Sequence, residues 1–228
     1  MPSSPPTASE PLDVRSTKER LIVTAERLFA ERGLHGVSLR QIGAAVGGSS
    51  PAAVQYHFGT KEVLVDAILM YRLPRLIERR AVLAAMAPPD DLRAVVEAYL
   101  LPVVELSELP DSYYLSFVEH VLWITTGPDA FYGLPAPYRE HRDRFVDQVT
   151  SLLPDVPEPV RTERVLEATL LCLHTSAYRE RAQRSGRPVM PLALQAAYLI
   201  DCAMSMLQAP VSSQARAALE VFNREGVR

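Results

Sequence analysis

Three adjacent side chains, Gln55, Tyr56 and His57, carry the hydrogen-bonding groups of an amide, a phenol and an imidazole. They end the stretch SLRQIGAAVGGSSPAAVQYHF, which reads as two short helical segments separated by Gly47-Gly48. An amide can bond a base edge in bidentate fashion, whereas a phenol and an imidazole donate to phosphate oxygens. The pattern is typical of a helix-turn-helix whose second helix enters the major groove of DNA.

Capping residues indicate where the first of these helices begins. Ser38 is followed three residues later by Gln41, so the two side chains can close a capping box and start a helix at Leu39. Its apolar residues recur at intervals of three and four, at Leu39, Ile42 and Val46. Gly47-Gly48 supplies the backbone freedom to end this helix.

The second helix is expected to begin at Pro51. Ser50 precedes it as an N-cap, and a proline at the first helical position loses no hydrogen bond. Val54 and Phe58 are four residues apart and are expected to pack inward. The residues left on the other faces, which can meet DNA, are Ala52, Ala53, Gln55 and Tyr56.

Two longer amphipathic helices flank this pair. Ser16 and Glu19 form a second capping box, from which an apolar stripe runs to Gly33. Thr60 is the expected cap of a further helix. Four helices are thus predicted between residue 16 and about residue 80.

In combination, these residues resemble the DNA-binding domain of the TetR family of transcriptional repressors. The matching pieces are LFAERG (28–33), VSLR (37–40) with Ile42, YHF (56–58) and Lys61-Glu62. The similarity covers roughly residues 16–70 and fades beyond them. It implies an all-α fold, with an N-terminal three-helix helix-turn-helix domain followed by a helical ligand-binding and dimerisation domain.

The resemblance implies contacts to the DNA backbone from two places. Tyr56, His57 and Lys61 are expected to contact phosphates, and Ser38 and Arg40 are expected to touch the backbone near the second helix. The alternatives are that Tyr56 is a half-buried aromatic, His57 a cap or packing residue, and Lys61 an ordinary exposed cation.

The recognition segment departs from the family pattern in its turn and its first residues. The stretch from Ile42 to Ser50 is one residue longer than usual, and Gln55 stands where a tyrosine is common. Pro51 and two alanines replace early polar residues, so Gln55 becomes the main base reader, with adenine as its partner and thymine methyl groups against the alanines. The predicted DNA contacts are Ser38, Arg40, Ser50, Pro51, Ala52, Ala53, Gln55, Tyr56, His57 and Lys61.

The 228 residues carry a net charge of −3, but the charge is unevenly placed. Residues 15–62 hold seven Lys or Arg and four Glu, a basic excess compatible with few phosphate contacts per subunit. The predicted division is a disordered tail at 1–14, the DNA-binding domain at 15–62, the helical domain at 63–210 and a tail at 211–228, which forms one weak helix or stays loose.

Other sequence features favour a cytoplasmic protein without catalytic function. Met1–Asp13 lacks the apolar run of a signal peptide, and no stretch is long and apolar enough to cross a membrane. Cys172 and Cys202 have no CxxC partner, which favours reduced core thiols over a disulfide, a metal site or a redox sensor. The motifs HExxH, GxSxG, P-loop and GxGxxG are absent, so neither an enzyme nor a cofactor nor a metal is expected.

The helical domain is predicted to contain helices near 90–107, 111–126, 137–153, 158–184 and 190–208, with a loop at 127–137. Pro74 and Pro102 fall inside helical patterns and predict kinks or breaks. The last two helices are apolar nearly all round, since Val165–Tyr178 carries only Glu167 as a formal charge and Val189–Leu207 only Asp201. We therefore expect 158–184 and 190–208 to form a homodimer through a four-helix bundle, with a buried monomer core as the alternative.

A set of aromatic and polar-tipped residues in this domain is expected to line a pocket for a small-molecule effector. The set is Tyr99, Tyr113, Phe117, His120, Trp123, Phe145, His174 and Tyr178. The alternative for each of them is an ordinary place in the core. The resulting hypothesis is a dimeric repressor that an effector releases from a palindromic operator, with the helix from Lys61 toward Pro74 as lever. The competing hypothesis is a dimeric ligand-binding or adaptor protein that does not read DNA sequence.

Overall fold

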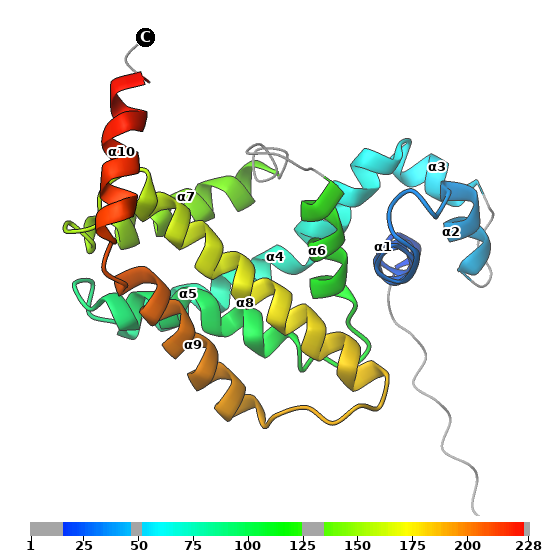
Figure 1. The fold of residues 1–228 in the computed structure, drawn as a ribbon. Helices are drawn as coiled ribbons and strands as arrows, with labels where there is room; N and C mark the ends of the chain where they lie inside the picture. Colours follow the sequence, from blue (N-terminus) through cyan, green and yellow to red (C-terminus); the bar gives the residue numbers. More distant parts are fainter. Residues whose placement is uncertain (1–15, 47–51, 125–134, 226–228) are drawn as a thin grey trace, which may run out of the picture.

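The computed structural model describes residues 16–46, 52–124 and 135–225, and the regular structure within them is entirely helical (Figure 1). The ten helices of the described residues are α1 (Thr17–Arg32), α2 (Leu39–Ala45), α3 (Ala53–Phe58), α4 (Lys61–Met86), α5 (Leu92–Leu106), α6 (Tyr114–Ile124), α7 (Ala136–Ser151), α8 (Val160–Arg184), α9 (Leu192–Gln208) and α10 (Ser213–Glu225). The all-α class expected from the sequence is confirmed.

The N-terminal head consists of α1, α2, α3 and the first turns of α4. Both predicted capping boxes are present, one between Ser16 and Glu19 and one between Ser38 and Gln41. Thr60 caps α4 by accepting from the amide of Val63 at 3.3 Å. The small core of the head buries apolar residues from all four helices, including Leu21, Ile22, Phe29, Ile42, Val54, Phe58, Leu64 and Ile68.

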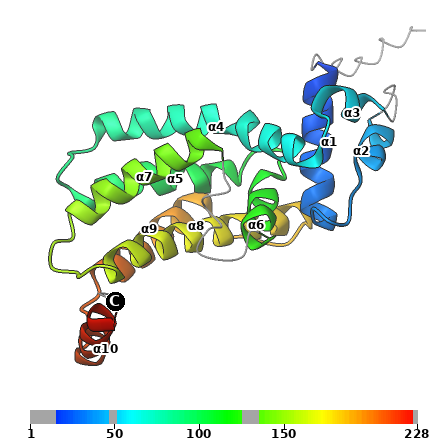
Figure 2. The same cartoon turned by 90° about the horizontal axis from the view of Figure 1, so that it is seen from above.

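The larger body is a layered helical bundle. α5 packs against α4, α8 and α9, and α7 covers α5 and α8 (Figure 2). α6 stands between the head and the body, with α1 on one side and α8 on the other. α10 projects away from the other helices at the far end of the body (Figures 1 and 2).

Three local expectations need correction or completion. α3 begins at Ala53, later than the predicted start at Pro51, and its N-cap Ala52 has no side-chain acceptor to offer. α4 and α5 continue through Pro74 and Pro102, so neither proline breaks its helix. The segment that was predicted to be weakly helical or loose forms the 13-residue α10.

No single helix in the described part of the chain combines the length and hydropathy needed to cross a membrane. α9 and α10 meet that criterion only as a pair, and a 60° bend separates them.

Candidate nucleic-acid interface and ligand cavity

The exposed tip of α3 is held by two buried anchors. Val54 and Phe58 point into the core of the head, as predicted. Gln55, Tyr56 and His57 are exposed, and 86% of the Tyr56 surface is accessible. The rings of Tyr56 and His57 meet edge to face with their centroids 5.1 Å apart. The Tyr56 phenol is exposed on a helix that is anchored in the core, so it is accessible to an external partner.

The remaining predicted DNA contacts differ in their exposure and in the hydrogen bonds that they already make. Ala52 is exposed and Ala53 half-buried, while Ser50 and Pro51 lie outside the described residues. Ser38 and Arg40 are exposed at the start of α2, although the Ser38 hydroxyl already serves its capping box. These groups lie on the same small head and present hydroxyl, amide and guanidinium donors to solvent.

Lys61 has a structural task that its sequence position did not reveal. Its Nζ donates to the carbonyl oxygen of Leu34 at 2.9 Å, which ties the start of α4 to the loop after α1. An ammonium group has three donors, so this bond leaves two for a phosphate.

A buried carboxylate connects the head to the body. Glu26 of α1 has no exposed surface, and it accepts from Arg72 of α4 at 3.2 and 3.3 Å and from the backbone amide of Tyr113 at 3.1 Å. Burial raises the pKa of Glu26 above its usual value, and the Arg72 charge opposes that shift. The Glu26 carboxyl group therefore links α1 of the head to α4 and to the start of α6.

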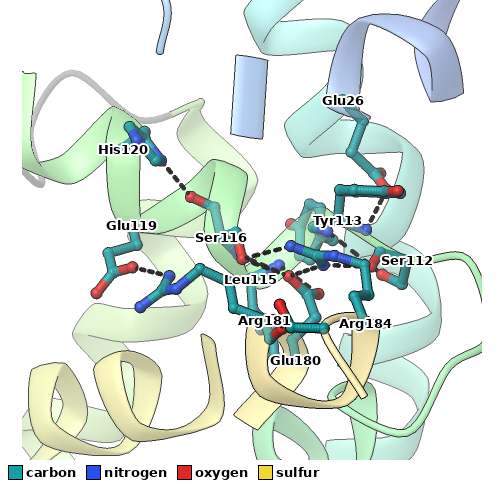
Figure 3. Close-up of polar contacts among 12 residues, drawn as sticks. Glu26, Ser112, Tyr113, Leu115, Ser116, Glu119, His120, Glu180, Arg181 and Arg184 are labelled. Atoms are coloured by element: carbon teal, nitrogen blue, oxygen red, sulfur yellow. Dashed lines mark hydrogen bonds and ion pairs between the residues drawn. The ribbon is translucent and has the colours of Figure 1, made fainter. Parts of the chain in front are cut away.

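A second buried carboxylate caps α6 from the opposite side. Glu180 of α8 accepts from the amides of Leu115 at 3.2 Å and Ser116 at 3.1 Å, and from the Ser116 hydroxyl at 2.6 Å (Figure 3). Arg184, one turn further along α8, pairs with Glu180 at 2.9 Å and donates to the carbonyl of Ser112. Negative charge is favourable at a helix N-terminus, so α1 and α8 both hold the first turn of α6.

The body also contains a cavity of about 350 Å³ that is lined by α4, α5 and α7 and is partly open to solvent. One wall is aromatic, because Tyr99 and Phe145 stack with ring centroids 3.7 Å apart. The α4 wall carries small side chains, Ala81 and Ala84, which leave room between the helices. Arg80 and His141 supply the nearby polar groups, and burial together with neighbouring cations lowers the pKa of His141 to about 4.

Comparison with known proteins gives a family match for the head. Residues 21–68, which hold most of α1, all of α2 and α3, and the first part of α4, match the family model for bacterial regulatory proteins of the tetR family. The N-terminal head of this chain is therefore similar to the DNA-binding domain of that family. The match includes the exposed tip of α3 and its buried anchors.

Individual relatives extend the likeness of the chain beyond the head. The HTH-type transcriptional repressor KstR2 of Rhodococcus jostii (strain RHA1) is 30% identical over 122 residues, which are 52% of this chain and 58% of that protein. The chain therefore matches little more than half the length of this relative.

Two solved structures share the whole fold. A TetR-like transcriptional regulator from Rhodococcus sp. RHA1 superposes with a TM-score of 0.58 at 16% identity, over 86% of this chain and 98% of its own. The ketosteroid transcriptional regulator KstR2 of Mycobacterium tuberculosis gives a TM-score of 0.58 at 19% identity, over 85% of this chain and 96% of its own. At these identities the likeness concerns the fold.

The described members of the eight residues predicted to line an effector pocket lie in different parts of the body. Tyr99 and Phe145 line the cavity between α4, α5 and α7. Phe117 is fully buried against Phe29 of α1, and His174 and Tyr178 are exposed on α8. Tyr113 and His120 belong to the region where α6 meets the head, and the Trp123 side chain lies outside the described residues.

The difference has a simple physical reason. Helical periodicity showed that the α6 residues share a stripe, but it does not say which neighbour that stripe faces. Sequence reasoning also missed Arg80 and His141. Each follows another charged residue, Arg79 or Glu140, so in the sequence both look like parts of a solvent-exposed helix face. Their positions become distinctive only when α4, α5 and α7 are brought together.

Proposed function

We propose that the protein is a DNA-binding transcriptional repressor that acts in the cytoplasm as a twofold dimer and leaves a palindromic operator when a small molecule binds its body. The observation that carries this proposal is the exposed tip of α3 within a head of the TetR family. Gln55 supplies the amide that can bond adenine, while Tyr56 and Arg40 supply donors for phosphates.

The dimer is supported by apolar side chains that remain exposed on α8 and α9. Tyr178 lies on α8, and Leu194 and Tyr198 lie on α9, each more than half accessible. Large apolar groups gathered on two neighbouring helices favour a partner surface, and a second copy satisfies both helices at once. A twofold axis there pairs two α3 helices, which must sit roughly 34–36 Å apart to fit successive turns of the major groove.

The release step is supported by the course of α4. Its first turns pack in the head through Leu64 and Ile68, and its later turns line the cavity through Arg80 and Ala84. A ligand that favours one position of α4 therefore changes the placement of the head. A coupling of about 1–3 kcal/mol changes DNA affinity roughly 5- to 150-fold.

The experiment is selection of preferred duplexes from a random pool by the purified chain, followed by affinity measurements. We expect a palindromic site. Gln55→Ala is expected to cost about 1–3 kcal/mol on that site and to relax one base position in each half. The matched variant Arg40→Gln is expected to weaken all sequences alike and to lower the salt slope by about one.

The same selection separates the competing hypothesis. An adaptor that keeps this fold without reading DNA enriches no palindrome, and then neither variant changes its binding. If a palindrome is enriched and its base preferences are unchanged in Gln55→Ala, a residue other than Gln55 contacts the bases.

A further inference from the structure

Arg80 is a buried cation whose charge is balanced by no carboxylate of the described residues. It is only 6% exposed, and its Nε donates to the carbonyl oxygen of Tyr99 at 2.9 Å. Its guanidinium lies 3.5 Å from the centroid of the Tyr99 ring. Within the described residues, no Asp or Glu oxygen comes within ion-pair distance of it. A guanidinium carries five N–H donors, so Tyr99 leaves four for another acceptor.

Other arginines in the interior of this protein are treated differently. Arg179, which is 4% exposed, pairs with Glu108 and also donates to Gln195. Arg72 pairs with the fully buried Glu26. A buried charge is costly unless a partner of opposite sign offsets it, and both of these arginines have one. Arg80 lacks that partner and lines a cavity, which is where an external anion would supply it.

The remaining polar lining of the cavity is also suited to an anion. Among the described residues, the lining contains Arg144, His141 and Gln148 and no Asp or Glu. His141 Nε2 is buried and has no hydrogen-bond partner among the described residues. Because the pKa of His141 is lowered to about 4, its ring is neutral near pH 7 and offers a hydrogen bond without adding a charge.

The rest of the lining is apolar and limits the size of the occupant. Arg80 and Phe145 lie within 4 Å of the Tyr99 ring centroid, so they must occupy its opposite faces. The wall beyond this stack is apolar and includes the small residues Ala81, Ala84 and Ala98 beside Ile77 and Val95. A volume of about 350 Å³ is near the lower end for ligand sites, which restricts the occupant to a compact molecule.

We infer that the effector of this protein is a compact apolar molecule with one carboxylate, and that Arg80 binds this carboxylate inside the cavity between α4, α5 and α7. The inference rests on the proposed function in calling the ligand an effector. The recognition itself follows from the unbalanced Arg80 charge and the apolar walls. Carboxylate and guanidinium match each other as a bidentate pair, which gives orientation as well as affinity.

The test compares acids with their neutral amides on the full chain. The probes are naphthoate with naphthamide, and decanoate with decanamide, measured by titration calorimetry and by the shift in melting temperature. We expect at least one acid to bind roughly 10- to 100-fold more tightly than its amide, the range for a hydrogen-bonded charge pair. Equal affinity within both pairs, or no binding by either acid at millimolar concentration, would overturn the inference.

Two variants of α4 locate the effect. Arg80→Gln is expected to bring the ratio between acid and amide close to one, whereas Arg75→Gln removes an exposed cation outside the cavity lining and leaves the ratio unchanged. Preference for the acid that persists in Arg80→Gln would refute the role of Arg80. If Arg80→Gln fails to fold, the comparison on the unchanged chain still decides.

Operator binding is measured separately without any probe. Failure there refutes the proposed repressor but leaves the selectivity of the cavity intact.

Discussion

Removing the Glu180 carboxylate is expected to destabilise the first turn of α6. The substitution Glu180→Ala deletes the acceptor of three hydrogen bonds from Leu115 and Ser116 and the ionic partner of Arg184. Glu180 is 2% exposed, so water cannot replace the lost oxygens without rearrangement. The donors left behind are two amides, one hydroxyl and one guanidinium.

The magnitude follows from these contacts. A hydrogen bond to a charged group contributes about 1.5–3 kcal/mol, but the carboxylate also pays for its own burial. Breaking a buried ion pair by removing one partner costs about 3–5 kcal/mol, and we expect Glu180→Ala to fall in that range. A domain is typically stable by only about 5–15 kcal/mol, so the loss is a large fraction of the total.

The assay is urea unfolding followed by helical circular dichroism, together with amide hydrogen exchange at Leu115 and Ser116. Glu31→Ala is the control, because its carboxylate belongs to an exposed pair with Arg27 at 3.7 Å, a type worth about 0–1 kcal/mol. Exchange at the two amides is expected to accelerate only in the Glu180 variant. If Glu180→Ala costs no more than Glu31→Ala, the capping role assigned to Glu180 is wrong.

Three further predictions follow from single side chains. Because the pKa of His141 is lowered to about 4 in the folded chain, the unfolded chain binds the proton at a higher pH, and the free energy of unfolding falls as pH drops from 6.5 to 4. His141→Phe is expected to remove about 1–2 kcal/mol of this pH dependence, as calorimetry would show. This is less than the full linkage energy because the ring is half exposed to solvent. Tyr198→Asp is expected to shift the proposed dimer toward monomer in sedimentation, and an unchanged mass would refute the proposed α8/α9 interface. Burial raises the pKa of Cys172 to about 12, so a thiol reagent at pH 8 should spare Cys172 until urea unfolds the chain, as peptide mapping would show.

Local sequence signals were sufficient for most of the head. Ser16, Ser38 and Thr60 each cap a helix through an amide three residues away, and such contacts depend on the immediate sequence alone. The inward direction of Val54 and Phe58 followed from their spacing in the same way. The predicted start of α3 at Pro51 is wrong. Ser50-Pro51 has the pattern of an N-cap and first helical residue, whereas Ala52 is the N-cap of α3 in the described residues.

The interior of the body was beyond local reasoning because its decisive contacts join distant parts of the chain. Glu26 meets Arg72 across 46 residues, and Glu180 meets Ser116 across 64. Periodicity assigns such residues to a helix face, but the neighbour that covers this face depends on the packing of whole helices. The unbalanced charge of Arg80 is likewise a property of the assembled cavity, since only the fold shows that no carboxylate of the described chain reaches it.

In the proposed mechanism, the position of Arg72 links a ligand at Arg80 to DNA binding. Both arginines lie on α4, eight residues apart, which is about 12 Å along a helix. Arg72 holds Glu26 of α1, and Glu26 in turn accepts from the backbone at the start of α6. A displacement of α4 at the cavity therefore pulls on α1 through a buried ion pair, whose separation in the interior is costly. An anion that binds Arg80 better in one position of α4 biases the head through this pair, and an anion that binds both positions equally cannot.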